Sequence, residues 1–370
     1  MLNRILTSLR FPTVLVRRAG GFPDPVEALE GRLLLSAFDQ IGLSLLRADA
    51  SFAGIDGSGV TVAILDTGLD STHRDLSSNF RGGFDAVNGE SLPVDRQGHG
   101  THVAGLAASS NPSIGVAPAA GLVGVKVLGD QGFGSNSDIA QGLRWVFDNR
   151  ERFNIAVVNM SLGSGFFTQA STLSSDPVVR EIRRLEGVGV TVVAAGGNSY
   201  KGHEFQNFAQ PGIASTLVVG AVWEDTLPNP TEWGSGAIDF TTAPDRVTSF
   251  SQRLVAPNTI FAPGALLRST TPRNSYSDMG GTSQASPVVA GAVALLQDAA
   301  LTFAGRLLTP SEVVSTLITT ADSVFDGDDE DDNVANTNVA YPRLNVYAAV
   351  QRVRTQFGNV APPPPPPPED

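Results

Sequence analysis

The chain has 370 residues, 41% of them hydrophobic, so it can bury a sizeable core in one domain or two. Its formal net charge of -12 argues against nucleic acid as a partner, because an acidic surface repels phosphates. Cysteine is absent, which excludes disulfides, thiolate metal ligands and a cysteine nucleophile, and does not place the protein inside or outside the cell.

Residues 1–50 form an N-terminal segment in which basic and apolar stretches alternate without clear periodicity. Arginines and Pro12 interrupt its apolar stretches, so the segment fits a secretory signal peptide poorly. The chain has no run of about 18 apolar residues, so we expect no transmembrane segment. We interpret residues 1–50 as a targeting segment or a short pro-segment.

In residues 51–356, an apolar run, a turn and an amphipathic stretch follow one another several times, and this pattern predicts one main folded domain. Five short runs rich in β-branched residues are bounded by glycine or proline. Such nearly continuous apolar runs are typical of parallel strands that are covered on both faces. The expected strands are residues 60–65, 122–128, 155–160, 190–195 and 217–222.

Helical stretches lie between these runs. The expected helices begin after an N-cap at Ser137, at Asp176–Pro177 and, with a capping box, at Thr309–Glu312. The alternation of strands and helices predicts an α/β fold with a mostly parallel sheet. Ligands in such folds bind beyond the carboxyl ends of the strands, so residues directly after each strand are the candidates for function.

Residues 357–370 form a proline-rich tail that contains seven consecutive prolines and ends in two acidic residues. A run of this kind favours the extended polyproline II conformation. We expect the tail to be a spacer or linker outside the core.

The first chemical motif, AILDTGLD at residues 63–70, places Asp66 at the end of a buried strand and directly before a glycine turn. A carboxylate there can orient a catalytic base. The alternative is that Asp66 only caps its own turn.

The second motif, GHGTHVAG at residues 98–105, has a histidine between two glycines, at the start of a helix of small residues. His99 is a candidate general base. A metal site formed by His99 and His102 is the alternative, but the spacing lacks the glutamate of the zinc-protease motif and has no third ligand. We expect His102 to be a structural neighbour that hydrogen-bonds to the backbone.

The third motif, GGTSQASP at residues 280–287, leads into an almost wholly apolar helix. Ser283 would lie on its first turn, beside the positive end of the helix dipole. The alternative is a serine that only caps this helix.

Together the three motifs resemble the signature segments of the subtilase family, in the family's order Asp, His, Ser. The resemblance extends over residues 55–352 and includes AAGGN at 194–198 and APG at 262–264. An α/β-hydrolase would need a histidine after Ser283, and none follows it. Chymotrypsin-like enzymes have another order and an all-β fold. Sedolisin-like relatives have a glutamate as the base, and the presence of His99 in this motif argues against that family.

The resemblance implies a three-layer subtilisin-like fold with helices on both faces of the sheet. It also implies a serine endopeptidase, with Ser283 as nucleophile, His99 as general base and Asp66 as the orienting carboxylate. Asn198 would supply a side-chain amide to the oxyanion hole. Its alternative role is to occupy a left-handed turn beside Gly197.

By the same resemblance, substrate binds as an added β-strand between two chain segments, and small residues line the pocket for the side chain before the cut. Small residues there favour a large apolar side chain, and we expect broad specificity. The expected substrate-binding residues are Gly132, Phe133, Gly134, Ser161, Leu162, Gly163, Ala194, Ala195 and Gly196.

The resemblance implies no cofactor for catalysis. Asp75 matches a carboxylate position of the family's structural calcium site, but the loop that would complete the site is short, which disfavours calcium there. The acidic run of residues 326–332 does not have EF-hand spacing, and we interpret it as a solvated loop.

The expected partners are protein or peptide substrates of a monomer, with no nucleic acid and no membrane span. Residues 27–37 are similar to N-terminal motifs of large exported planctomycete proteins, and together with the proline tail they favour a secreted or cell-surface protein, with the cytoplasm as the alternative. Two other functions stay open: a binding or adhesion module that keeps the scaffold, and an esterase with the same triad.

Overall fold

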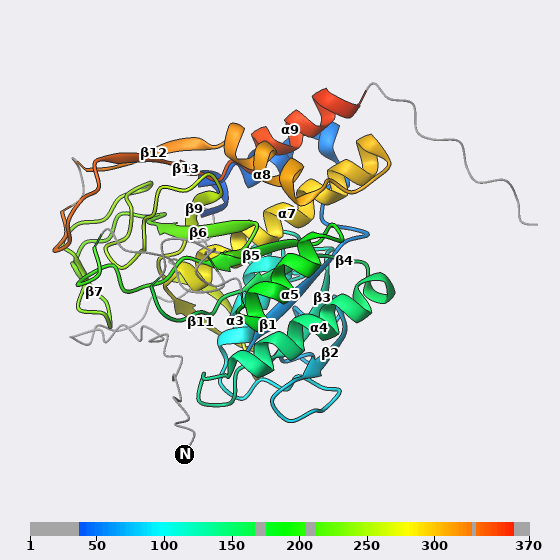
Figure 1. Ribbon diagram of the computed structural model, residues 1–370. Coiled ribbons are helices and arrows are strands. Elements are labelled where there is room, and N and C mark those ends of the chain that lie inside the picture. The colour runs from blue at the N-terminus through cyan, green and yellow to red at the C-terminus, as the bar shows by residue number, and fades with distance from the viewer. Residues whose placement is uncertain (1–36, 167–174, 205–211, 213, 328–330, 359–370) are drawn as a thin grey trace, which may run out of the picture.

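The computed structural model describes residues 37–166, 175–204, 212, 214–327 and 331–358 (Figure 1). Its centre is a nine-stranded sheet in the order β12-β13-β9-β6-β5-β4-β1-β3-β2. Every pair of neighbours is parallel except β12 and β13. The strands are β1 (Thr61–Asp66), β2 (Phe80–Asp85), β3 (Gly121–Lys126), β4 (Ile155–Met160), β5 (Thr191–Ala195), β6 (Leu217–Val222), β9 (Thr259–Pro263), β12 (Asp322–Asp326) and β13 (Val339–Arg343).

Two short antiparallel pairs lie outside this sheet, β7 (Thr231–Glu232) with β8 (Ile238–Asp239), and β10 (Leu267–Thr271) with β11 (Ser275–Met279).

The helices of the main fold cover both faces of the sheet (Figure 1). Helices α4 and α5 pack together on one face, and α3 and α7 pack together on the other. The prediction of a three-layer α/β fold with a mostly parallel sheet is therefore confirmed. The helices are α2 (Leu43–Ala48), η1 (Ala50–Phe52), α3 (His99–Ala108), α4 (Asn136–Phe153), α5 (Pro177–Glu186), α7 (Thr282–Ala304), α8 (Pro310–Thr319) and α9 (Val346–Phe357).

Strand β1 shows why the inner strands are apolar at every position. Its successive side chains point to opposite faces, so Val62 and Ile64 join the core under α3 and α7, while Ala63 and Leu65 join the core under α4 and α5. All six of its residues are buried. The five expected strands are all present, with ends within two residues of those predicted.

Two of the three predicted helix N-termini are confirmed, and one is wrong. Asp176 caps α5, and Thr309 forms the expected capping box with Glu312 at α8. The prediction that Ser137 is an N-cap is wrong, because Ser135 caps α4 and its hydroxyl accepts a hydrogen bond from the backbone N–H of Asp138. Ser137 lies within the first turn of the helix.

Helix α7 is the central helix of the larger core. Among the described residues it is the one helix with the length and apolar composition to span a membrane, and 78% of its most apolar stretch is buried inside the protein. An apolar helix that is buried all round is typical of the core of a large domain.

Residues 37–52 pack into the same core as the residues that follow them. Ile41, Leu43 and Leu46 are buried there, and α2 lies against α9 near the other end of the chain. The folded unit thus includes residues 37–50, the part of the expected N-terminal segment that the structure describes; residues 1–36 lie outside the described residues, as does the tail from residue 359.

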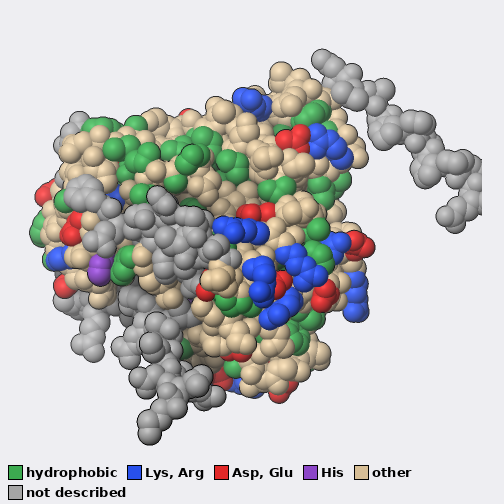
Figure 2. Space-filling view, in the orientation of Figure 1, with side chains coloured by type: hydrophobic (Ala, Val, Ile, Leu, Met, Phe, Trp, Pro, Cys, Tyr) green, Lys and Arg blue, Asp and Glu red, His purple; other side chains and the backbone are tan. Residues whose placement is uncertain are grey.

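Arginine side chains gather over α5 on one face of this acidic protein (Figure 2). Arg180 and Arg184 lie within 4 Å of the buried carboxylate of Glu181. The guanidinium of Arg184 also stacks on the ring of Phe147 in α4, 3.7 Å from its centroid. Arg184 therefore helps to fasten α5 to α4.

Candidate active site

Asp66 and His99 form a hydrogen-bonded pair at the carboxyl end of β1. Asp66 is the last residue of that strand and is fully buried, and His99 is the first residue of α3. The imidazole Nδ1 lies 2.8 Å from Asp66 Oδ1 and 3.0 Å from Oδ2. The carboxylate thus fixes the ring and leaves Nε2 as the nitrogen that can exchange a proton with another group.

The surroundings of His99 act on its pKa in opposite directions. Burial disfavours the imidazolium and would lower the pKa, whereas the nearby carboxylate of Asp66, and more weakly that of Asp95, stabilise the charged ring. The carboxylates prevail, and the pKa of His99 is raised above its usual 6.5. His102, one turn along α3, has its pKa lowered to about 3 by burial and by His99, so it is neutral at ordinary pH.

Ser283 lies on the first turn of α7 and is 2% exposed. Pro287 has no N–H to donate to the carbonyl of Ser283, four residues earlier, so that carbonyl instead accepts a hydrogen bond of 2.7 Å from the hydroxyl of Ser161. The hydroxyl of Ser283 lies 3.4 Å from the backbone oxygen of Ser161. Ser161 therefore holds the turn that carries Ser283.

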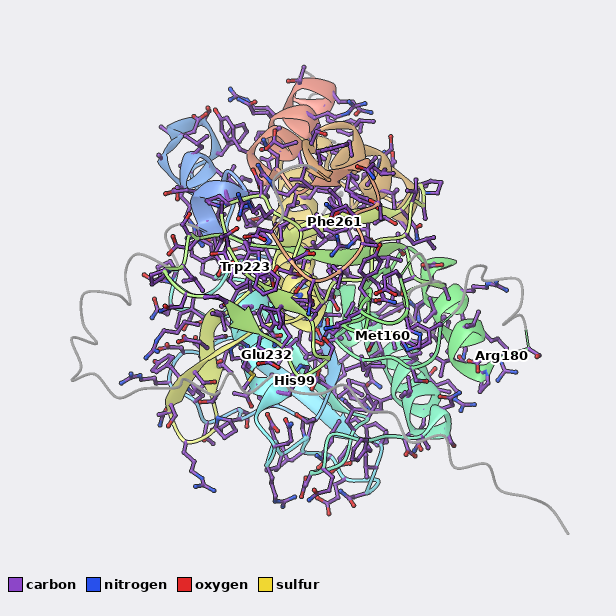
Figure 3. All side chains as sticks on the ribbon, turned by 90° about the vertical axis from the view of Figure 1, so that its left-hand side faces the viewer. His99, Met160, Arg180, Trp223, Glu232 and Phe261 are labelled. Carbon is purple, nitrogen blue, oxygen red and sulfur yellow. The ribbon has the colours of Figure 1, made fainter. Side chains whose placement is uncertain are left out.

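The order of the strands brings these groups to one edge of the sheet. Strands β1, β4 and β5 are neighbours, and Asp66, Ser161 and Asn198 lie at or directly beyond their carboxyl ends. Neighbouring strands are about 4.8 Å apart, so side chains on adjacent strand ends can meet. Figure 3 shows His99 near the middle of this side of the molecule, well away from Arg180 of α5.

No hydrogen bond joins Ser283 to His99 among the residues that the structure describes. Helices α3 and α7, whose first turns carry these two residues, pack against each other. In free enzymes a catalytic hydrogen bond is often long and tightens only when substrate binds. The three predicted residues are therefore gathered at one edge, with the Asp66–His99 bond already made.

Asn198 follows β5 and is fixed by the residue before Ser283. Its Oδ1 accepts hydrogen bonds of 2.8 Å from both the backbone N–H and the hydroxyl of Thr282. The amide oxygen is thus occupied, and the NH₂ group is left as the donor. Gly197, and not Asn198, has the positive φ of 118°, so the left-handed turn that was the alternative role of Asn198 belongs to its neighbour.

The predicted substrate-binding residues lie at or beyond the carboxyl ends of β3, β4 and β5, with β1 between β3 and β4. Gly132–Gly134 form a tight turn after β3, in which a Cβ at Gly134 would lie 2.2 Å from the carbonyl oxygen of Val127. Ser161–Gly163 follow β4, and Leu162 is 1% exposed. Ala194 and Ala195 end β5 and are fully buried, and Gly196 follows them.

Comparison with known proteins agrees with this geometry. The model of the subtilase family matches residues 57–352. The chain belongs to the subtilase family. It is a subtilisin-like serine endopeptidase, as its similarity to curated proteases of that type also supports.

Among those relatives, Subtilisin Savinase of Lederbergia lenta is 42% identical over 261 residues, which cover 69% of this chain and 83% of the relative. An alkaline protease of Shouchella clausii is 39% identical over 304 residues, or 78% of this chain and 70% of the relative. The crystal structure of a cold adapted subtilisin-like serine proteinase matches with a TM-score of 0.59 and 29% identity, over 80% of this chain and 91% of that one. The subtilisin-like fold expected from the sequence is confirmed.

The second histidine of the subtilase's GHGTH motif has a structural place. His102 is fully buried, and its Nε2 lies 3.1 Å from the carbonyl oxygen of Leu267 and 3.0 Å from that of Ser277. The expectation that His102 hydrogen-bonds to the backbone is confirmed. Within the described residues, no cluster of three or more histidine and acidic side chains is arranged to hold a metal ion.

Asp75 and the loop of residues 109–116, the positions considered for calcium, have partners within the chain. The Asp75 carboxylate accepts a hydrogen bond of 2.7 Å from the hydroxyl of Tyr276. In the loop of residues 109–116, the carbonyl oxygens of Pro112 and Gly115 each lie 2.7 Å from the guanidinium of Arg47. The carboxylate and these carbonyls are thus already engaged by partners within the chain.

The acidic run 326–332 is a solvated loop only in part. Asp326 is fully buried and pairs with the equally buried guanidinium of Arg253, so the expectation of a solvated loop is wrong at this residue. Residues 328–330 lie outside the described residues.

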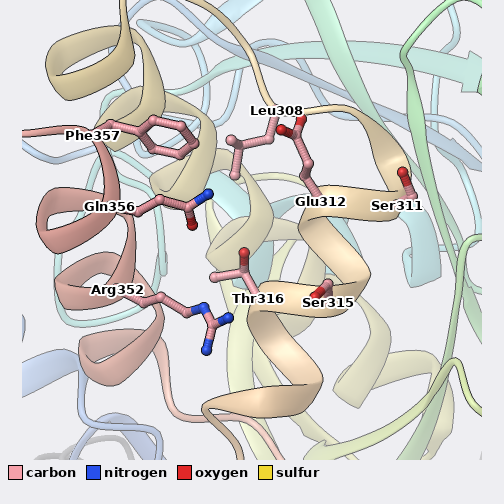
Figure 4. A pocket seen from close by; sticks show the side chains of 8 residues that line it. All are labelled: Leu308, Ser311, Glu312, Ser315, Thr316, Arg352, Gln356 and Phe357. Carbon is pink, nitrogen blue, oxygen red and sulfur yellow. The ribbon is translucent and has the colours of Figure 1, made fainter. Parts of the chain in front are cut away.

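The hollow between α8 and α9 is a separate feature (Figure 4). It lies near the C-terminal end of α7, and Ser283 is at the N-terminal end of this helix of 23 residues, roughly 34 Å long at about 1.5 Å per residue. Its acidic residue, Glu312, is bound by both Nη atoms of Arg306 at 2.9 and 2.7 Å. The hollow offers no catalytic group to the reaction.

Several residues that shape the site are not apparent from the motifs. Thr282 orients Asn198, Asp95 accepts hydrogen bonds at the start of α3, and the amide of Asn159 links the hydroxyls of Ser161 and Ser286. The only sequence signal for them is their position within a few residues of a predicted catalytic residue or strand end.

Proposed function

We propose that the subtilase hydrolyses peptide bonds through a triad of Ser283, His99 and Asp66 and an acyl-enzyme intermediate. The observation that supports this most strongly is the pair of short contacts between His99 Nδ1 and the buried carboxylate of Asp66. A fully buried carboxylate held against an imidazole stabilises the ring when it becomes charged during proton transfer.

Each residue has a definite role in the proposed reaction. His99 Nε2 accepts the proton of the Ser283 hydroxyl as its oxygen attacks the peptide carbonyl. The imidazolium then gives that proton to the leaving amine, and the acyl group stays on Ser283. Water repeats the sequence: it loses a proton to His99, attacks the ester and releases the acid and the free hydroxyl.

The negative oxygen of the tetrahedral intermediate needs donors that are already in place. The NH₂ group of Asn198 is oriented by the bonds that its oxygen receives from Thr282. The backbone N–H of Ser283 is one of the first-turn groups of α7 that have no partner within the helix. We assign these two donors to the oxyanion hole.

Substrate is proposed to add as a strand between residues 132–134 and residues 161–163. Main-chain pairing of this kind holds an extended peptide of any sequence, which supports broad specificity. Glycines at both edges allow close approach of the backbones. Ala194, Ala195 and Gly196 are assigned to the side-chain pocket, where their small size favours a large apolar group.

The location, oligomeric state and metal content of the protein are proposed from other features of the chain. We propose that the protein is exported, on the resemblance of residues 27–37 to export-associated motifs, and that it acts as a monomer on protein substrates. Catalysis by the proposed triad needs no cofactor. Since Asp75 and the carbonyls of the 109–116 loop are engaged by Tyr276 and Arg47, we also propose that folding does not depend on calcium there.

The central test compares the wild type with Ser283→Ala, using a fluorophosphonate probe and a peptide substrate. We expect the wild type to be labelled and Ser283→Ala to be unlabelled, with turnover lower by on the order of 10⁶. Ser113→Ala, at an exposed serine, is the control and should behave as the wild type. An unlabelled and inactive wild type would support a binding module, and turnover of esters alone would support an esterase.

A further inference from the structure

The first turn of α3, which carries His99, has an unusual set of hydrogen-bond acceptors. The N-cap residue is Gly98, which has no side chain to cap the helix. Instead, the first three N–H groups donate to three side chains from outside the helix. His99 N–H donates to Gln97 Oε1 at 2.7 Å, Gly100 N–H to Thr67 Oγ1 at 2.9 Å, and Thr101 N–H to Asp95 Oδ2 at 2.9 Å.

Asp95 is the centre of this arrangement. It is 5% exposed, and its carboxylate accepts five hydrogen bonds. Oδ1 accepts from the Thr67 hydroxyl at 3.0 Å and from the N–H groups of Gln97 and Gly98. Oδ2 accepts from the N–H of Thr101 at 2.9 Å and from its hydroxyl at 2.6 Å. All five partners are donors, which suits an acceptor-only carboxylate.

Thr67 connects Asp95 to the catalytic strand. It directly follows Asp66, and its hydroxyl donates to Asp95 while accepting from Gly100, the residue after His99. Its own N–H donates to Asp66 Oδ1 at 2.7 Å. One short chain of bonds thus ties the end of β1, which holds Asp66, to the turn of α3 that holds His99.

We propose that Asp95 is a positioning residue, which through Thr67 and Thr101 fixes the first turn of α3 against the end of β1 and so keeps the His99 ring in register with Asp66. It contacts neither substrate nor the reacting atoms. The proposal rests on the triad proposed above, because positioning matters only if His99 transfers the proton.

The negative charge of Asp95 also stabilises the protonated form of His99. It adds to the effect of Asp66 in raising the pKa of His99. Other titratable groups nearby are His102 on α3, which is neutral, and Lys126 at the end of β3, whose Nζ donates to the carbonyl oxygen of Thr67 at 2.7 Å. Asp70, whose backbone N–H donates to the Thr101 hydroxyl at 3.0 Å, and Arg96, which pairs with Asp130, also lie close by. Loss of the Asp95 charge should therefore lower the pH at which His99 is protonated.

The first test is Asp95→Asn, which keeps the shape but turns an NH₂ group toward at least two donors. We expect kcat to fall by about tenfold to a hundredfold with KM within about twofold, because displacement of a catalytic group by about 1 Å has effects of this size. The acid limb of kcat/KM should move to lower pH. The matched control is Asp85→Asn, since Asp85, the last residue of β2, likewise has a buried carboxylate that accepts from two backbone N–H groups, those of Val87 and Asn88.

A second pair of variants keeps the test decisive if Asp95→Asn folds poorly. Thr67→Val has the same shape without the hydroxyl and should lower kcat, while Thr67→Ser keeps the hydroxyl and should restore it to near the wild-type value. Equal losses in Asp95→Asn and Asp85→Asn, with the acid limb unmoved, would show that Asp95 is only structural and would overturn the proposal.

The NMR signal of the Nδ1 proton of His99 in the resting enzyme separates this proposal from the proposed function. We expect the wild type and Asp85→Asn to show a strongly deshielded signal and Asp95→Asn to lose it or shift it upfield. If the wild type showed the signal but neither turnover nor probe labelling, the proposed function would fail while positioning held. An unchanged signal in Asp95→Asn would refute the positioning role.

Discussion

The amide oxygen of Asn198 lies 2.8 Å from the backbone nitrogen of Thr282, so the residue before the proposed nucleophile sets the direction of the proposed oxyanion donor. The Thr282 hydroxyl makes a second bond of the same length to this oxygen and also accepts a bond of 3.0 Å from the N–H of Gly197. The donor and the nucleophile are therefore held as one unit.

This relationship predicts different effects for two replacements of Asn198. Asn198→Asp keeps an acceptor for Thr282 but replaces the donor with a negative charge, whereas Asn198→Ala removes both. We expect Asn198→Ala to lower kcat by ~10²–10³ with little change in KM, because the donor acts mainly in the transition state. Asn198→Asp should be at least as slow although it keeps the structure around Thr282. Steady-state kinetics with a peptide substrate measure both, and an Asp variant with near wild-type kcat would contradict the oxyanion role.

The pKa of His99 predicts the acid limit of activity. The base must be neutral, and because the ring's pKa is raised above 6.5, kcat/KM should decline with a midpoint above pH 6.5 as the pH is lowered. Replacement of Asp66 by asparagine removes the largest stabilisation of the charged ring, so the midpoint should move down while the rate falls about 10⁴-fold. The pH profile of kcat/KM at constant ionic strength is the measurement. A wild-type midpoint at or below pH 6.5 would show that burial prevails.

Five inner strands could be predicted from sequence because they are covered on both faces, whereas the edge strands, β13 and the fully buried inner strand β9 are not among those expected. Strands such as β1 and β4 are covered on both faces, so every residue is buried and the sequence is continuously apolar. Strand β2 lies at one edge, contains two glycines and an arginine, and has only its last residue buried. At the other edge, β12 begins and ends with an acidic residue and has only two buried residues, and β13 beside it contains a proline and an arginine.

The same contrast applies to the candidate site. Asp66, His99 and Ser283 lie in motifs whose residue types already indicate chemistry. Thr67 and Asp95 act through contacts across 28 residues, and Asn198 and Thr282 across 84. A single sequence contains no signal for such pairings, because the register between distant segments depends on the folded sheet.

We predict that replacing one member of the buried ion pair Arg253–Asp326 greatly destabilises the protein. Both side chains are fully buried, and the guanidinium also donates to the carbonyl oxygen of Thr248 at 3.0 Å. Asp326 in turn accepts from the N–H of Thr337 at 2.8 Å. Arg253→Met would leave a buried carboxylate without its cation, and we expect a loss of about 3–5 kcal/mol in the free energy of unfolding.

Removal of both charges is the informative comparison for this pair. The double variant Arg253→Met with Asp326→Asn leaves no unpaired charge and should recover part of the loss. Denaturant unfolding of an inactive Ser283→Ala background, which avoids self-digestion, gives the values. A double variant that is less stable by the sum of the two single effects would show that the two side chains do not interact.

We predict that Arg47 stabilises the loop of residues 109–116. Its guanidinium donates to the carbonyl oxygens of Pro112 and Gly115, each at 2.7 Å, and to that of Val116 at 3.3 Å. Arg47 lies before the segment matched by the family model, so this contact depends on the N-terminal residues of this chain. We expect Arg47→Ala to lower the free energy of unfolding by about 1–2 kcal/mol, because the bonds are charge-assisted but partly exposed.

The measurement is the Tm of the Ser283→Ala background with and without a chelator. Since Arg47 already engages these carbonyls, we expect the chelator to leave the Tm unchanged, whereas Arg47→Ala should lower it by about 2–5 °C. Arg81→Ala is the matched control, because Arg81 is an exposed arginine whose Nη1 donates to one backbone carbonyl, that of Ser78 at 2.7 Å. A Tm that falls on chelation in the background protein would mean that a bound metal stabilises the fold, and an Arg47→Ala effect no larger than that of Arg81→Ala would mean that the loop holds its shape without Arg47.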